Sequence, residues 1–276
     1  MLAGNVYHEA SDQFTADQTF SSFLSRLSQD ENWHSYLLGD ALRSVEDKDA
    51  LPEFGIKIDQ VTKLEIETPF RDLYYLIQKQ HISKKELVDC IVKAEFSEWN
   101  SIYLYALRLV GDFSVKFQHA AATIEAHKQK IIKFLDDLPE EIRPPADLFR
   151  LPVVWNNKIL IIEEDTPFRE FLSDLLGSIA KIEQVSDSGQ GLEKIHESFF
   201  NAVISDMNMK MMSGIDLYNK AVEANPDISR NFLFYLDEIT PESKTFFKEN
   251  HLSYLKKPLN LKGLTQTVEE IMEKAL

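Results

Sequence analysis

The sequence has 276 residues and a formal net charge of −15, and its length predicts two domains rather than one. Hydrophobic residues make up 44% and charged residues 27%, which is typical of a folded protein and counts against bulk disorder. The acidic balance counts against nucleic-acid binding, and the single cysteine, Cys90, excludes an internal disulfide and a cysteine-based zinc site. No apolar run reaches the roughly 18 residues of a membrane span, and the N-terminus lacks a secretory pattern, so we expect a soluble cytoplasmic protein that does not bind membranes.

The first half of the sequence shows only helical periodicity. Apolar positions that recur at intervals of three and four predict amphipathic helices over 20–42, 83–109 and 117–138. Ionisable residues occupy core-facing positions in all three, namely Glu31, His34, Glu95, Glu98 and His127. Burying such groups is costly unless they pair or ligate a metal. Two interpretations therefore stay open: these residues pair with one another or reach solvent, or they form a metal site.

Segments of this half resemble a known family. VYHEASDQFTADQTFSSFLSRLSQDENWHSYLL, KAEFSEWNSIYLY and FQHAAATIEAHKQKIIKFL are similar to helices of rubrerythrin-like, ferritin-like domains. The resemblance covers about residues 5–138 and implies a four-helix bundle with a long crossover at roughly residues 47–80 and a di-iron centre.

Two departures from the ferritin-like pattern remove ligands from the implied di-iron site. Ile124 stands where the family has the glutamate of a Glu-x-x-His pair, and the first helix is expected to be short, with Glu9 as the nearest carboxylate. The remaining ligand set implies one iron or other transition metal, or a vestigial site held by hydrogen bonds: Glu31, His34, Glu95 or Glu98, and His127. A short first helix would also leave apolar surface that a homodimer would cover.

Prolines mark the boundary between the halves. Four of the ten prolines lie between Pro139 and Pro152, and proline ends helices. We therefore predict a helical bundle over 1–140, a proline-rich linker over 141–156 and a second domain over 157–276.

In the second half, short apolar runs alternate with amphipathic stretches. These runs predict five strands of a parallel sheet, at 158–162, 181–185, 202–205, 232–234 and 253–255. Sites in such sheets form beyond the carboxyl ends of the strands. The residues found there are Glu163-Glu164-Asp165 after the first strand, Asp206 after the third, Tyr235 at the fourth and Lys256-Lys257-Pro258 after the fifth. The carboxylates suit Mg²⁺, a lysine suits a phosphoryl group, and an aspartate beside both is a plausible phosphoryl acceptor.

Three of these segments, KILIIEEDTPFRE, AVISDMNMKMMSGIDLY and SYLKKPLN, resemble a response-regulator receiver domain. The resemblance implies a flavodoxin-like α/β fold whose five-stranded parallel sheet has the order 2-1-3-4-5. It implies that Asp206 accepts a phosphoryl group from a histidine kinase or phosphotransfer protein and that Lys257 contacts this group. It also implies Mg²⁺ ligands and an aromatic switch position; the ligands are Glu163, Glu164, Asp206 and the Asn208 carbonyl, and the switch residue is Tyr254.

The receiver-like half departs from that family at three positions. Glutamates at 163 and 164 replace an aspartate-rich pair, and Tyr235 occupies the second switch position, where the family has threonine or serine. A phenol carries its hydroxyl several ångströms further from the backbone than those residues do. Lys210 replaces a common proline, with little effect expected.

Together these features predict a response regulator of a two-component system, or phosphorelay, and not an enzyme. It would signal through protein contacts of its helical domain, to an unknown downstream protein, without binding nucleic acid. The alternative is a metal- or redox-sensing bundle whose degenerate receiver serves as a docking module. An oxygen-activating di-iron enzyme is a third reading, against which the missing glutamates count.

Overall fold

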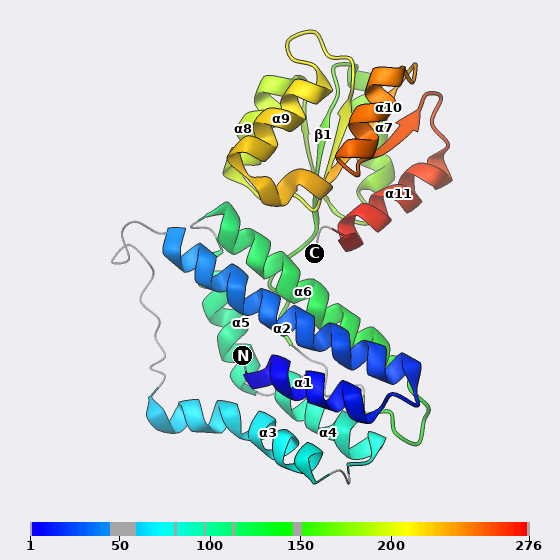
Figure 1. The fold of residues 1–276 in the computed structure, drawn as a ribbon. Coiled ribbons are helices and arrows are strands. Elements are labelled where there is room, and N and C mark those ends of the chain that lie inside the picture. The colour runs from blue at the N-terminus through cyan, green and yellow to red at the C-terminus, as the bar shows by residue number, and fades with distance from the viewer. Residues whose placement is uncertain are drawn as a thin grey trace. The chain divides into compact units, whose positions relative to one another are not determined.

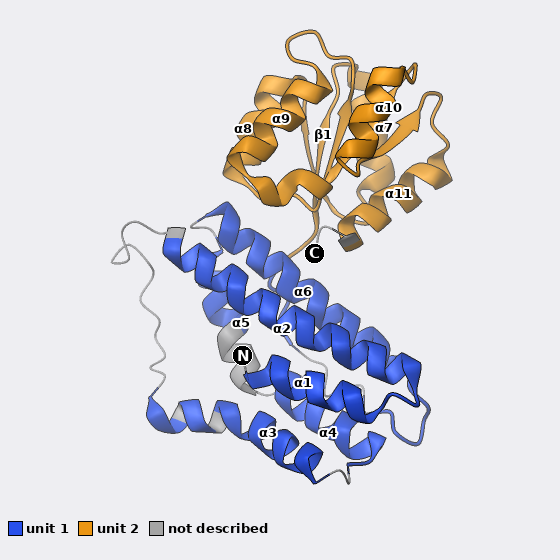
Figure 2. Ribbon diagram, viewed as in Figure 1, with its two compact units in different colours: residues 1–154 blue, residues 155–276 orange. Residues whose placement is uncertain are grey.

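A computed structural model describes residues 2–44, 59–79, 82–96, 98–111, 114–145 and 151–274. The chain divides into two compact units, residues 1–154 and 155–276 (Figure 2). None of the described helices combines the length and the apolar character that a membrane crossing needs.

The regular elements described in the first unit are all helices (Figure 1). Its helices are α1 (Leu2–Gln13), α2 (Gln18–Ser44), α3 (Gln60–Gln78), α4 (Lys84–Glu95), α5 (Glu98–Val110) and α6 (Val115–Asp136). The predicted start of α4 is confirmed, because the Ser83 hydroxyl accepts the Glu86 N–H while the Glu86 carboxylate accepts the Ser83 N–H. At the start of α6 the Ser114 hydroxyl accepts the Phe117 N–H.

An apolar core joins α1, α2, α4 and α6 with the end of α3. Aromatic rings contribute to it, and Phe23 of α2 stacks on the partly buried Phe134 of α6 with ring centroids 3.6 Å apart. Since α2 and α6 pack along each other, the polar residues that both helices carry on their buried sides are brought together (Figure 1).

One prediction for the first unit is wrong, and a second segment contains a helix that was not predicted. The helix expected over 83–109 is interrupted: α4 ends at Glu95, and Phe96 leaves helical geometry with φ −118° and ψ 24°. Its ring packs against the apolar core, which explains why an apolar residue sits at the break. The stretch expected to be a crossover contains α3, a helix with Pro69 inside it. Residues 45–58 of that stretch lie outside the described residues.

The second unit contains the predicted parallel sheet. Its strands are β1 (Lys158–Ile162), β2 (Lys181–Val185), β3 (Ala202–Asp206), β4 (Phe232–Leu236) and β5 (Ser253–Lys256), in the order β2-β1-β3-β4-β5. The five strands and their order are therefore confirmed. In the parallel register Asp206 stands beside Tyr235, so β4 continues one residue past the end of β3.

Helices cover both faces of the sheet. They are α7 (Thr166–Leu176), α8 (Ser188–Glu197), α9 (Gly214–Ala224), α10 (Pro241–Glu249) and α11 (Leu261–Lys274), with a short 3₁₀ helix at Pro226–Arg230. One apolar core joins α8, α9 and α10 to one face, and another joins α7 and α11 to the other. Thr240 caps the start of α10, because its hydroxyl accepts a hydrogen bond from the Ser243 N–H.

Candidate functional site

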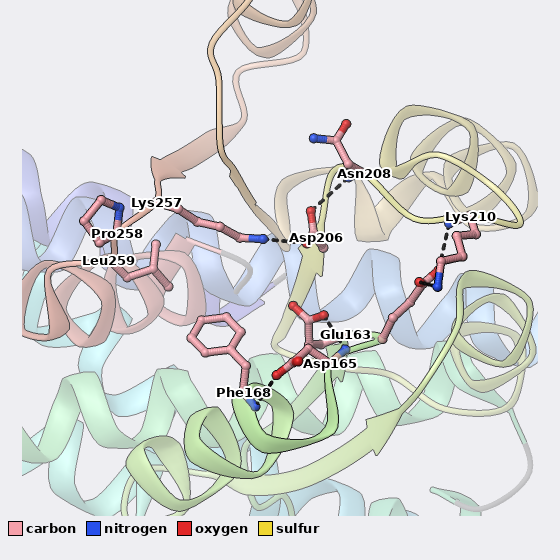
Figure 3. A pocket seen from close by; sticks show the side chains of 10 residues that line it. Glu163, Asp165, Phe168, Asp206, Asn208, Lys210, Lys257, Pro258 and Leu259 are labelled. Atoms are coloured by element: carbon pink, nitrogen blue, oxygen red, sulfur yellow. Dashed lines mark hydrogen bonds and ion pairs between the residues drawn. The ribbon is translucent and has the colours of Figure 1, made fainter.

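A pocket of about 670 Å³ opens at the carboxyl edge of the sheet in the second unit (Figure 3). Alternation along the strands explains which residues meet there. Glu163 continues the β1 series of Ile159 and Ile161, and Asp206 continues the β3 series of Ala202 and Ile204, all on the side covered by α7 and α11. The sheet therefore brings the two acids to one face and one edge.

Asp206 is held from two sides. Its Oδ2 lies 2.7 Å from the Lys257 ammonium, and its Oδ1 accepts the Asn208 N–H at 2.9 Å (Figure 3). Burial lowers the pKa of Lys257, but the hydrogen bond and charge of Asp206 outweigh it, with Asp237 and Glu163 adding to the effect, so this pKa is raised. Lys257 is therefore a fixed cation beside the aspartate.

Glu163 is the most enclosed acid of the pocket, with 4% of its surface exposed. Its Oε1 accepts the Asp165 N–H at 2.7 Å, and its Oε2 accepts the Tyr235 hydroxyl at 2.6 Å. Both carboxylate oxygens thus have a donor from the protein itself. Tyr235 is fully buried, and its hydroxyl is directed to this acid.

Glu164 lies nearer the mouth of the pocket. Its Oε1 accepts the Lys210 N–H at 2.7 Å, and its Oε2 lies 3.2 Å from the Lys210 ammonium. The backbone hydrogen bond, with the Lys210 side chain, lowers the pKa of Glu164. The Lys210 side chain is 89% exposed, so the ion pair itself contributes little stability, whereas the backbone bond fixes the loop after β3 to the end of β1.

The pocket is chemically suited to a divalent cation. Its lining includes four carboxylates, from Glu163, Glu164, Asp165 and Asp206, and two ammonium groups, from Lys210 and Lys257. Carboxylate oxygens are the ligands that Mg²⁺ prefers, and the lining has more negative than positive groups. The residues present therefore fit this ion, with Glu164 and Asp206 facing the open space and Glu163 behind them.

The two aromatic residues predicted at switch positions, Tyr235 and Tyr254, lie on opposite faces of the sheet. Tyr235 belongs to the apolar core on the α7 and α11 side. Tyr254 of β5 is half-buried and stacks on Phe247 of α10, with ring centroids 4.5 Å apart. Tyr254 thus lies against the other face of the sheet and is not part of the pocket lining.

Residues 159–269 match the family of response regulator receiver domains. The second unit is a receiver domain. This receiver is 31% identical over 117 residues to an uncharacterized response regulatory protein of Vibrio cholerae, an overlap of 41% of this chain and 47% of that protein. It is 26% identical over 118 residues to the response regulator receiver protein CpdR of Brucella abortus, covering 42% of this chain and 96% of that protein.

Solved structures overlap the same part of the chain. A CheY-like receiver from Methanospirillum hungatei is 24% identical, with a TM-score of 0.41 and coverage of 44% of this chain and 97% of that one. The chain spans about half the length of the two Vibrio relatives that it matches, those of Vibrio cholerae and Vibrio vulnificus. All of these similarities concern the receiver and leave the helical unit without a counterpart among them.

A second polar cluster lies within the helical unit. Ligand atoms of Glu31, His34 and His127 lie within 4.8 Å of one another. His127 Nε2 is 3.3 Å from Glu31 Oε1 and 3.9 Å from Glu95 Oε2, and its Nδ1 is 3.0 Å from Asp30 Oδ2. The helices thus bring together four of the five residues predicted there; the side chain of the fifth, Glu98, lies outside the described residues.

The charges of this cluster depend on one another. Burial lowers the pKa of His127, yet its hydrogen bond to Asp30 and the nearby carboxylates of Glu31 and Glu95 outweigh burial and hold that pKa well above its usual value. Burial raises the pKa of Glu31, but the neighbouring imidazoles of His127 and His34 outweigh burial and lower it. An imidazolium among carboxylates therefore offsets their negative charge, while the buried Nε2 atoms of His34 and His127 have no hydrogen-bond partner among the described residues.

The sequence interpretation did not identify two members of the cluster. Asp30 precedes Glu31 on α2, and Tyr7 of α1 donates its hydroxyl to Glu95. The spacing of Val6, Tyr7 and Ala10 on the buried side of α1 was a signal for Tyr7. Tyr7 and Ile124 supply no carboxylate, and the described residues whose ligand atoms converge are Glu31, His34 and His127.

Proposed function

We propose that this protein is a phosphorylated response regulator in which Asp206 accepts a phosphoryl group from a histidine kinase or phosphotransfer protein. One observation carries the proposal: the Asp206 carboxylate lies between the Lys257 ammonium and the acids at the end of β1, in the lining of an open pocket. This is the arrangement that phosphoryl transfer to a carboxylate requires, with a nucleophile, a fixed cation and a site for a divalent metal.

In this proposal, an Asp206 oxygen attacks phosphorus and forms an acyl phosphate as the bond from phosphorus to the donor nitrogen or oxygen breaks. The Lys257 ammonium neutralises charge on the phosphoryl oxygens. Glu164, Asp206 and the Asn208 carbonyl would hold Mg²⁺, which when bound offsets the negative charge of phosphate and acids. The N–H of Asn208 keeps the Asp206 carboxylate oriented during the reaction.

Replacing Asp206 with asparagine is expected to abolish phosphorylation. The wild-type chain should gain one phosphoryl group on incubation with acetyl phosphate and Mg²⁺, measured as intact mass, whereas Asp206→Asn should gain none because the amide is not a nucleophile. Asp237→Asn is the matched control, since Asp237 lies 3.9 Å from Lys257 but is not the proposed acceptor. Labelling of Asp206→Asn would refute the assignment of the acceptor.

We also propose that the output runs through protein contacts of the helical unit, as a homodimer or with another protein, rather than through nucleic acid. The net charge of −15 supports this, because phosphate backbones attract basic surfaces. Hydrogen exchange of residues 1–154 in the same phosphorylated samples tests it. Exchange that is identical with and without acetyl phosphate would reject signalling through this unit.

A second candidate function, metal binding in a ferritin-like helical unit, is supported by the convergence of Glu31, His34 and His127. Freshly purified protein is then expected to contain about one transition-metal ion per chain, with iron the first candidate, and His127→Ala is expected to lose it. Elemental analysis by mass spectrometry provides the measurement. His8→Ala, an exposed change in the same unit, should retain the metal. Wild-type protein that remains metal-free after incubation with Fe²⁺ and Zn²⁺ would reject this function.

A further inference from the structure

Tyr235 occupies a central position behind the receiver pocket. It is fully buried on β4, in register with Asp206 on β3, and its ring meets Phe168 of α7 edge-on with centroids 5.7 Å apart. The apolar surroundings fix the ring, while its hydroxyl emerges among the polar groups of the pocket. Such a side chain has little freedom to move without disturbing the core.

The hydroxyl of Tyr235 reaches an acid two strands away. Glu163 follows β1, and β3 lies between β1 and β4. Neighbouring strands are about 4.8 Å apart, so β1 and β4 are separated by roughly 10 Å. Only a pair of long side chains spans this gap, and Glu163 and Tyr235 do so with a hydrogen bond of 2.6 Å. The two departures from the receiver pattern thus compensate for each other: a long acid meets a long donor.

The ring of Tyr235 also contacts the opposite side of the pocket. The Lys257 ammonium lies 5.1 Å from the ring centroid, within the range of a cation–π interaction, while it binds Asp206. Burial, with the neighbouring Glu163, raises the pKa of Tyr235 far above its usual value, so the phenol stays protonated and remains a donor. Tyr235 therefore contacts a carboxylate, that of Glu163, and an ammonium group, that of Lys257.

We propose that Tyr235 is a positioning residue of the receiver, which holds Glu163 and Lys257 in place around Asp206 so that Mg²⁺ binding depends on its hydroxyl. This inference rests on the proposed function of the pocket. It assigns Tyr235 a role in the acid pocket and none in contacting the phosphoryl group.

The direct test is Tyr235→Phe in the full chain, with Mg²⁺ affinity measured by isothermal titration calorimetry. Removing the hydroxyl leaves Oε2 of the buried Glu163 without its donor, and we expect the dissociation constant for Mg²⁺ to rise about tenfold. The phosphorylation rate at saturating Mg²⁺ should change by less than about threefold, since Asp206, Lys257 and the ring remain. Tyr218→Phe removes another buried phenol hydroxyl of the receiver, away from the pocket, and should leave Mg²⁺ affinity unchanged.

A double-mutant cycle separates positioning from general loss of structure. In a Glu163→Ala background, Tyr235→Phe is expected to have no further effect on Mg²⁺ affinity, because the hydroxyl no longer has its partner. Unchanged or tighter Mg²⁺ binding by Tyr235→Phe, or the same tenfold loss in both backgrounds, would overturn the proposal. If the wild type binds Mg²⁺ but accepts no phosphoryl group, the proposed function fails, while the calorimetry still decides the role of Tyr235. A wild type that binds no Mg²⁺ overturns both the proposed function and the role of Tyr235.

Discussion

Replacing Lys257 with methionine is expected to slow phosphorylation by acetyl phosphate about 100- to 1000-fold. The Lys257 ammonium lies 2.7 Å from Asp206 Oδ2, and its raised pKa keeps it charged. It is thus placed to offset the negative charge that develops as phosphorus approaches the carboxylate. Losing one such fixed donor typically costs this much in rate. The measurement is the rate of gain of the phosphoryl group, followed by intact mass at saturating Mg²⁺.

Methionine keeps the apolar stem that Lys257 places near the Tyr235 ring, so the change mainly removes charge. Lys256→Met is the matched control: Lys256 is the adjacent residue, ends β5 and is exposed. Its rate is expected to stay within about twofold of the wild type. A Lys257→Met rate that also stays within threefold would contradict the role assigned to this lysine.

The receiver fold could be predicted from the sequence because local signals agree with the global arrangement. Apolar runs such as Lys158–Ile162 and Phe232–Leu236 form strands that are covered by helices on both faces. Capping residues such as Thr240 then mark where helices begin. Since the carboxyl ends of parallel strands lie at one edge of the sheet, the sequence predicts that the residues after neighbouring strands lie close together.

The details of the pocket were not predictable in the same way. The hydrogen bond from Tyr235 to Glu163 depends on the direction of two side chains across an intervening strand, and no short sequence pattern specifies it. The Lys210 N–H that holds Glu164 depends on the path of the loop after β3. Both contacts occur at departures from the receiver pattern, so the departures themselves were the available signal.

In the helical unit, the hydrophobic periodicity of the sequence predicted which residues are buried but not where helices end or which polar groups pair. It correctly placed His34 and His127 on buried faces, and both are less than a tenth exposed. It did not show that Phe96 ends a helix, because an apolar residue fits the helical stripe equally well whether or not the backbone continues. Nor does an apolar stripe predict the polar partners that other helices supply, such as Asp30 for His127 and Tyr7 for Glu95. The ferritin-like ancestry of this unit stays a prediction.

Lys128→Met is expected to lower the free energy of unfolding of the helical unit by about 3 kcal/mol. Lys128 and Glu125 form an ion pair at 2.8 Å on α6, and each is less than a tenth exposed. Lys128 also donates to the Pro152 carbonyl, and Glu125 accepts the Val154 N–H, so the pair ties the segment before β1 to α6. Urea denaturation, monitored through hydrogen exchange of peptides from α6, measures the loss in free energy of unfolding.

The size of this effect comes from the buried carboxylate that remains, more than from the contact that is lost. Removing one partner leaves Glu125 with an uncompensated charge, although the side chain of Gln129 and the backbone of Val154 still donate to it. Neutralising both partners in Glu125→Gln, Lys128→Met should therefore recover more than half of the stability. Lys130→Met, an exposed change on the same helix, should cost less than about 0.5 kcal/mol. If Lys128→Met matched that control, the ion pair would contribute nothing to the helical unit, and the segment at 152–154 would need another anchor.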